Sequence, residues 1–169
     1  MDRVAELTTG ERLQPALLDR LRDDEPQAKA ESRERRVMSM RQLRDAVLRD
    51  LSWLMNTPSK PDFDELHQFP LVAKSVLNYG ILDFTGLSVE SLRSVRLEYV
   101  VKEAIEAFEP RIMKMGLQVR AVENRRESTP TLVAFEISGD MCPLPMPEAL
   151  FLRTELDLDT GQCELKERG

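Results

Sequence analysis

The chain has 169 residues, of which 41% are hydrophobic and 32% charged, enough for one domain with a hydrophobic core and a charged surface. Its net charge of -6 argues against nucleic acid or an anionic membrane as the main partner, because both attract basic surfaces. Two cysteines and one histidine, His67, are too few for a disulfide framework or a zinc site, so we expect reduced thiols in the cytoplasm and no metal or cofactor. The acidic charge makes other proteins the expected partners.

The first 36 residues combine a short amphipathic helix with a charged linker. Leucines at helical spacing predict a helix over residues 12–22, which is too short to be stable alone. Residues 23–36 are mostly charged and contain Pro26, which indicates a solvated linker. Two alternatives stay open: the helix docks on a partner, or it folds back on its own domain. The leucines are Leu13, Leu17, Leu18 and Leu21.

A second apolar stripe, from about Met38 to Asn56, predicts the first helix of a globular domain that comprises residues 37–169. Trp53 points away from this stripe. Its indole is either covered by another part of the chain, which the usual burial of aromatics favours, or free to anchor a partner. The stripe consists of Met40, Leu43, Val47, Leu51 and Leu54.

Residues 57–87 show no regular period and contain three prolines, which indicates a long connection. Within it, residues 75–84 are too apolar to lie free in solvent, and Asn78-Tyr79-Gly80 tolerates a left-handed turn. We interpret this stretch as a turn held to the core by apolar side chains. These side chains are Val76, Leu77, Ile81 and Phe84.

The next predicted helix is capped by Ser88 and ends at Phe108. It ends there because Pro110 has no amide hydrogen and pushes the preceding Glu109 toward an extended backbone. Positions two apart in an extended segment share a face, so Glu109 and Arg111 are expected side by side at a rigid corner. The helical stripe consists of Leu97, Val100, Val101, Ala104, Ile105 and Phe108.

Period-two alternation predicts strands in the last third of the chain. The first runs from Met113 to Ala121, and the second, centred on residues 133–137, ends at Gly139-Asp140. Asp159-Thr160-Gly161 is a hairpin turn into a last strand near residues 162–166. The third strand alternates Leu150, Leu152, Leu156 and Leu158 with Phe151, Arg153, Glu155 and Asp157.

Helices first and strands last predict an α+β fold, in which N-terminal helices pack on a mostly antiparallel C-terminal sheet that ends in a hairpin. The terminal strand of such a sheet is often an edge. An edge offers unpaired backbone groups to another protein, so we expect the hairpin to be an interaction site.

The sequence gives little support for an enzyme. Glu109 is the obvious candidate for the general acid of a glycoside hydrolase, but Arg111 beside it would stabilise the charged form, which is wrong for an acid. The chain has no glycine-rich phosphate loop and no nucleophile elbow, and His67 has no convincing catalytic companion. A muramidase-like peptidoglycan hydrolase remains the alternative to a binding protein.

Four motifs together resemble the TssE family of type VI secretion baseplate subunits, which is similar to the lysozyme-named wedge proteins of contractile-tailed phages. The resemblance spans residues 13 to about 161 and departs from the family at Leu82, where a proline is expected. The motifs are Leu17-Leu18-Asp19-Arg20-Leu21, Arg49-Asp50-Leu51 with Leu54-Met55-Asn56-Thr57, the stretch from Ser75 to Phe84, and Phe108-Glu109-Pro110-Arg111.

The resemblance implies a structural baseplate component at the cytoplasmic side of the inner membrane, without catalysis and without direct membrane insertion. The implied partners are the wedge subunits TssF, TssG and TssK and the sheath subunits TssB and TssC. The Glu-Pro-Arg motif would contact the wedge, and the hairpin of residues 150–166 would extend the strand network of the sheath. The residues that we expect at partner contacts are Glu109, Pro110, Arg111, Leu17, Leu18, Leu21, Arg153, Glu155 and Asp157.

The corner also leads to an expectation about variants. Because Pro110 already fixes the backbone, Glu109 and Arg111 could bond to a partner with little ordering cost. We therefore expect Glu109→Ala and Arg111→Ala to leave the isolated fold intact and to weaken assembly with wedge partners.

Overall fold

The computed structural model describes residues 15–21, 39–59, 68–88, 97–122, 131–141 and 148–167. Helices precede a four-stranded antiparallel sheet of order β1-β2-β3-β4, which confirms the predicted α+β fold. The helices are α1 (Leu17–Leu21), α2 (Met40–Met55), α4 (Pro70–Ala73), the 3-10 helix η2 (Val76–Asn78) and α6 (Leu97–Phe108). The strands are β1 (Gln118–Val122), β2 (Leu132–Met141), β3 (Glu148–Asp157) and β4 (Cys163–Glu167).

Some of the sequence predictions fall outside the described residues. They are His67, Leu13 with the predicted start of the first helix, the boundary between residues 36 and 37, and residues 89–96, which lie between Ser88 and α6. Within the described ranges, no helix has the length and hydrophobicity needed to cross a bilayer.

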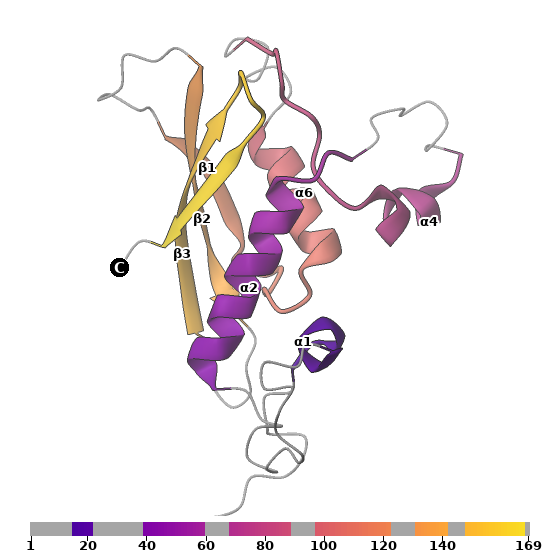
Figure 1. The fold of residues 1–169 in the computed structure, drawn as a ribbon, viewed down its shortest axis with the longest axis vertical. Coiled ribbons are helices and arrows are strands. Elements are labelled where there is room, and N and C mark those ends of the chain that lie inside the picture. The colour runs from indigo at the N-terminus through magenta and orange to yellow at the C-terminus, as the bar shows by residue number, and fades with distance from the viewer. Residues whose placement is uncertain are drawn as a thin grey trace, which may run out of the picture.

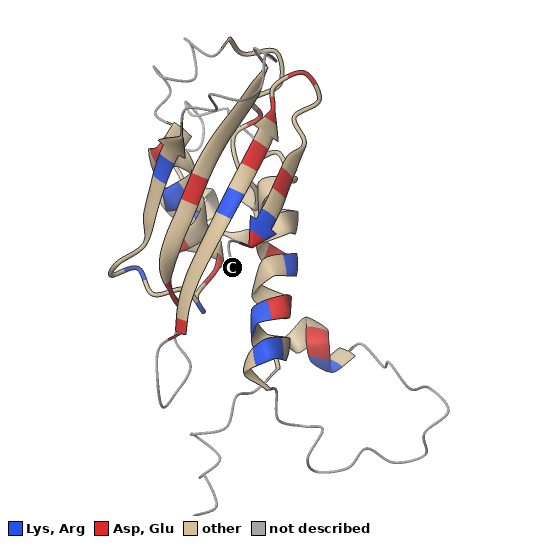
Figure 2. Cartoon of the chain, turned by 90° about the vertical axis from the view of Figure 1, so that its left-hand side faces the viewer, with Lys and Arg blue, Asp and Glu red and all other residues tan. Residues whose placement is uncertain are grey.

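Helices α2 and α6 lie against one face of the sheet, and no described helix covers the other face (Figures 1 and 2). Their apolar stripes meet the inward side chains of the sheet in one core. Burying each of these large side chains contributes about 1.5–3 kcal/mol relative to leaving it exposed. The most completely buried side chains include Leu51, Leu54, Phe84, Ile105, Phe135, Ile137, Leu152 and Leu156.

Helix α2 begins at a capping box. The Ser39 N–H donates to Gln42 Oε1 (2.9 Å), and the Gln42 N–H donates to Ser39 Oγ (3.2 Å), so donors at the helix start are satisfied. The predicted stripe is buried apart from the half-buried Met40. Trp53 is 49% exposed, with the Arg49 guanidinium of the same helix 5.0 Å from its ring centroid, so the favoured prediction that another part of the chain covers it is wrong.

Strand β1 is shorter than predicted, because the chain turns before it. The Leu117 N–H bonds to the Lys114 carbonyl, and Gly116 adopts a φ of 100°, so the run from Met113 cannot be a continuous strand. Met113 and Met115 are consequently exposed, and Ile112 takes the buried position before the turn. Ala121, predicted to face inward, is exposed as well.

Strand β2 is longer than predicted. It continues through Gly139 to Met141, and Gly139 pairs with Leu150 of β3. A Cβ at Gly139 would lie 3.4 Å from Ile112 and 3.5 Å from Leu117, which are ordinary contact distances, so this position does not require glycine and the strand continues through it.

The predicted C-terminal hairpin is confirmed, and it consists of β3 and β4. Leu150, Leu152, Leu156 and Leu158 are buried, and the turn at residues 159–161 leads into β4, which pairs antiparallel with β3. Gly161 completes the turn with a φ of 72°, a conformation that glycine adopts without steric cost.

The connection before α6 packs differently from the prediction. Ile81 and Phe84 are buried as expected, but Val76 and Leu77 are 82% and 79% exposed. The reason is the 3-10 turn η2, which the aperiodic sequence did not reveal and which turns these two side chains outward.

Gly80 fixes this connection to the end of α2 and generates a stability prediction. The N–H of Ile81 bonds to the Thr57 carbonyl (2.9 Å), and the N–H of Ser59 bonds to the Ile81 carbonyl (2.7 Å). With a φ of 129°, Gly80 lies so close that an added Cβ would be 2.2 Å from the Thr57 oxygen. Only glycine fits there without moving backbone.

We expect Gly80→Ala to lower the free energy of unfolding by at least about 3 kcal/mol in urea denaturation, because backbone must shift. The control is Gly86→Ala: its φ of 77° is also left-handed, but a Cβ there meets no atom within 4 Å. Only the backbone strain of about 1–2 kcal/mol applies to it. Equal losses in the two variants would contradict this account.

Candidate functional site

The Glu-Pro-Arg corner joins α6 to the sheet. The Glu109 N–H makes the last helical hydrogen bond, to the Ile105 carbonyl (2.9 Å), and Pro110 then prevents the helix from continuing. Immediately after the corner, Ile112 forms a bridge with Met141 at the end of β2. The corner is therefore fixed on both sides, by the helix before it and by the sheet after it.

Glu109 and Arg111 lie side by side, as predicted, and they bind each other. The predicted extended backbone is wrong, however, because residues 110 and 111 form a turn in which the Ile112 N–H donates to the Glu109 carbonyl (3.2 Å). Arg111 Nε donates to Glu109 Oε1 (2.7 Å) and Arg111 Nη2 to Oε2, while the Arg111 N–H also donates to Oε1 (3.0 Å). This two-pronged arrangement is the strongest geometry for a guanidinium and a carboxylate. Glu109 is only 3% exposed, so its carboxylate is not presented to solvent.

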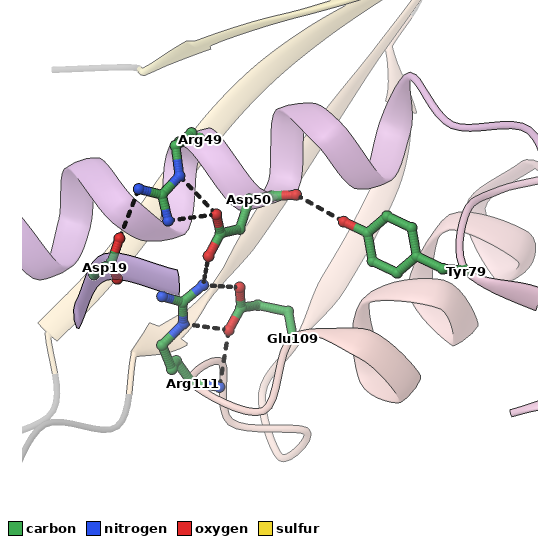
Figure 3. Close-up of polar contacts among 6 residues, drawn as sticks. All are labelled: Asp19, Arg49, Asp50, Tyr79, Glu109 and Arg111. Atoms are coloured by element: carbon green, nitrogen blue, oxygen red, sulfur yellow. Dashed lines mark hydrogen bonds and ion pairs between the residues drawn. The ribbon is translucent and has the colours of Figure 1, made fainter. Parts of the chain in front are cut away.

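Arg111 also reaches across to α2. Its Nη2 donates to Asp50 Oδ2, and the other oxygen of Asp50 accepts from Arg49 Nε (2.8 Å). Arg49 in turn donates from Nη1 to Asp19 of α1 (2.7 Å). Figure 3 shows the resulting alternation of charges, which we call the charge network: Asp19, Arg49, Asp50, Arg111 and Glu109.

The electrostatics of the charge network keep its cations charged. Burial disfavours the charge of Arg111, but the hydrogen bonds and charge of Glu109, and then those of Asp50, outweigh burial and raise the pKa of Arg111. Burial, followed by the negative charges of Asp50 and Glu109, raises the pKa of Tyr79. The Tyr79 hydroxyl donates to the Asp50 carbonyl (3.3 Å), and its ring packs edge-on against Phe108, with 5.3 Å between the ring centroids.

This arrangement is suited to holding the chain together and not to acid–base chemistry. Both oxygens of Glu109 are bound to Arg111, and Asp50 is held by two arginines, so both carboxylates are occupied by contacts within the chain. Burial raises the pKa of the Cys163 thiol to about 12, which leaves it neutral and unreactive. Across the described ranges, no group of three or more His, Cys, Asp or Glu side chains is arranged to hold a metal ion.

Helix α1 joins this site through its polar side. Asp19 faces Arg49, whereas Leu17, Leu18 and Leu21 are all exposed. The two alternatives for this helix are therefore not exclusive: it contacts its own domain by one carboxylate and turns its leucines to solvent.

The hairpin residues lie elsewhere, on the sheet. Arg153 and Glu155 alternate along β3 with buried residues, so they belong to the opposite face of the sheet, where Arg153 pairs across the strands with Lys166. No described helix covers that face (Figure 2). Lys166 lies 3.5 Å from Glu155. Asp157 instead accepts the N–H of Asp159 (2.8 Å) within the hairpin turn, so it stabilises that turn. The structure thus separates the predicted residues into a helical site and a sheet site.

Sequence reasoning missed the central role of Asp50. It lies 61 residues before Arg111 in the chain, and its neighbour Arg49 provides an obvious local partner. The one signal available was its position beside the buried stripe of α2, next to Leu51.

Comparison with known proteins gives one family. The family model described as baseplate wedge protein gp25 matches residues 41–142, more than half of the chain, from α2 to the end of β2. No curated protein and no solved structure matches the chain.

The burial of Glu109 changes the expectation that variants of this corner leave the isolated fold intact. We expect Arg111→Met to lower the free energy of unfolding by about 3–5 kcal/mol, because it leaves a buried carboxylate without its partner. Urea denaturation of the purified protein measures this loss. The double variant Glu109→Met with Arg111→Met should recover part of it, since no unpaired charge then remains at Glu109.

The matched control for Arg111→Met is Lys102→Met, which removes an exposed pair with Glu106 at 3.9 Å on α6. Such a pair contributes about 0.5 kcal/mol or less. A loss as small as this in Arg111→Met would show that the charge network does not support the fold.

Proposed function

The chain belongs to the baseplate wedge protein gp25 family, and from this membership we propose that it is the wedge subunit of a type VI secretion baseplate. The family makes it a structural, non-enzymatic component of the baseplate of a contractile injection system. The proposed wedge partners are TssF, TssG and TssK, and the proposed sheath partners are TssB and TssC. The baseplate would lie in the cytoplasm, docked to the inner membrane.

The type VI assignment is supported by the four motifs that resemble TssE. In this structure three of them meet at the charge network, which contains Asp19, Asp50 and Glu109 from three different motifs. Tyr79, from the remaining motif, donates to the Asp50 carbonyl. The motifs therefore support one site despite their distance in the chain.

The observation that carries the proposed sheath contact is the outer edge of β4. The Asn56 side chain bonds both backbone groups of Cys163, accepting its N–H (2.9 Å) and donating to its carbonyl (2.9 Å). Backbone groups of alternate residues in an antiparallel strand point the same way, so those of Leu165 and Glu167 also face outward. Among the described residues no side chain bonds them, which makes this edge suitable for strand addition from a sheath subunit.

The proposed wedge contact lies on the helical side of the molecule. The exposed leucines of α1 offer apolar area, while Pro110 and the outward part of Arg111 offer a fixed corner. Glu109 is buried, so we assign it the role of holding Arg111 in place.

The sheath contact is tested by Glu167→Pro against Glu167→Ala. Both variants remove the ion pair with Arg44 (2.6 Å), but only proline removes the outward N–H that strand addition needs. We expect Glu167→Pro to reduce the frequency of sheath formation in cells that carry fluorescent TssB by about tenfold or more, and Glu167→Ala to leave it near normal.

Stability should not separate these two variants by more than about 1 kcal/mol, because the missing N–H faces away from β3 and not into the ladder. Normal sheath formation with a stable Glu167→Pro protein would show that the sheath does not bind at the edge of β4.

The wedge contact is tested by replacing the α1 leucines. Leu17→Ser with Leu21→Ser keeps the Asp19 contact to Arg49 and removes two exposed apolar side chains. We expect binding to a purified complex of TssF and TssG to weaken by about tenfold, with unchanged stability of the free protein.

Tyr99→Ser, which replaces another exposed apolar side chain on α6, is the control and should bind normally. Unaltered affinity of the leucine variant would exclude α1 from the wedge contact. Failure of the unmodified chain to bind TssF and TssG at all would reject the type VI assignment itself.

A further inference from the structure

A second apolar surface lies on the segment that contains α4 and η2. Leu71, Val76 and Leu77 are 87%, 82% and 79% exposed, and Phe69 and Val72 are exposed beside them. We call these five residues the α4–η2 patch. Figure 1 shows the segment standing away from the body of the molecule on the helical side, remote from the sheet. None of the predicted partner residues belongs to it.

The segment that carries the patch is held in shape by its own hydrogen bonds. Ser75 Oγ donates to the Val72 carbonyl (2.9 Å) and accepts the Leu77 N–H (3.3 Å), and Asn78 Nδ2 donates to the Ala73 carbonyl (3.1 Å). Tyr79 attaches its base to Phe108 and to Asp50. The apolar side chains are therefore displayed on an ordered scaffold, and binding through them requires little further ordering.

We propose that the α4–η2 patch docks into an uncharged, apolar groove on another protein subunit of the baseplate wedge. This inference rests on the proposed function for the existence of such a neighbour, but not on the Glu-Pro-Arg corner or the β4 edge. The segment that carries the patch projects from the body of the molecule, so a groove is the partner surface that fits it (Figure 1). Exposed apolar area of this kind on a soluble protein commonly marks an interaction surface.

The charge of the segment defines the chemistry of the groove. Between Gln68 and Tyr79 the one charged residue is Lys74. A charged side chain on the floor of the groove would lose water without gaining a partner, so the floor must consist of apolar side chains.

The scarcity of basic residues on this segment argues against a membrane as the partner of the patch. Surface-bound segments combine apolar side chains with several basic ones that attract anionic lipids. Lys74 alone, on a chain with a net charge of -6, gives little such attraction.

The size of the patch argues against a second copy of this chain. A stable interface buries about 800 Å² on each partner. Helices of four and three residues are too small to supply this area by themselves. As an additional anchor within a larger wedge interface, a few well-placed apolar side chains are sufficient.

The experiment uses the full chain and a wedge complex of TssF, TssG and TssK. We expect Leu71→Ser with Leu77→Ser to weaken binding to this complex by about 10- to 100-fold, while the urea midpoint of the free protein stays unchanged. Tyr99→Ser is the matched control, because Tyr99 is also exposed but lies on α6 outside the patch. A photo-cross-linking residue at position 71 should link to a wedge subunit, and one at position 99 should not.

Other occupants give distinguishable results, and each overturns the proposal. Cross-links from position 71 to the same chain would show that the chain covers its own patch. Self-association of the free protein that the double variant abolishes would identify a second copy. Sedimentation with vesicles of phosphatidylglycerol and phosphatidylethanolamine, lost in the double variant, would identify a membrane. Normal wedge binding by the double variant would reject the docking role of the patch and leave the proposed function unaffected. No wedge binding by the unmodified chain would reject the proposed function.

Discussion

The need to neutralise one buried carboxylate shapes the helical side of this protein. Glu109 lies at the point where α6 ends, and its burial is tolerable only because Arg111 binds both of its oxygens. Arg111 simultaneously binds Asp50, so the same cation that stabilises the corner also fixes α2 against it. Pro110 holds the two residues at the right spacing, and α1 is joined to this arrangement through Asp19 and Arg49.

The two helices also protect the sheet edges with single side chains. Asn56, which follows α2, bonds both backbone groups of Cys163 on β4, and Glu98 of α6 accepts the N–H of Ala121 on β1 (2.7 Å). An antiparallel sheet with free edges tends to pair with other chains. Among the described residues, one side chain thus bonds the outward backbone of each edge strand, at Cys163 on β4 and at Ala121 on β1.

The amphipathic elements of this fold were predictable because their signal is local. The stripes of α2 and α6 and the alternation of β3 follow from side-chain periodicity, and the order of helices and strands defines the α+β class. The elements that were misjudged depend on single glycines and short turns. Gly116 turns the chain before β1, and Gly139 lies within β2 instead of ending it, although both appear in the sequence as similar interruptions.

The local sequence predicts that Glu109 and Arg111 lie close together, because Pro110 ends the helix and restricts the backbone between them. The burial of Glu109, and the contact of Arg111 with Asp50 far away in the chain, follow from tertiary packing. Tertiary packing likewise decides that Val76 and Leu77 face solvent. The physical reason is that periodicity reports which face of an element is apolar, whereas burial depends on which other elements fold against that face.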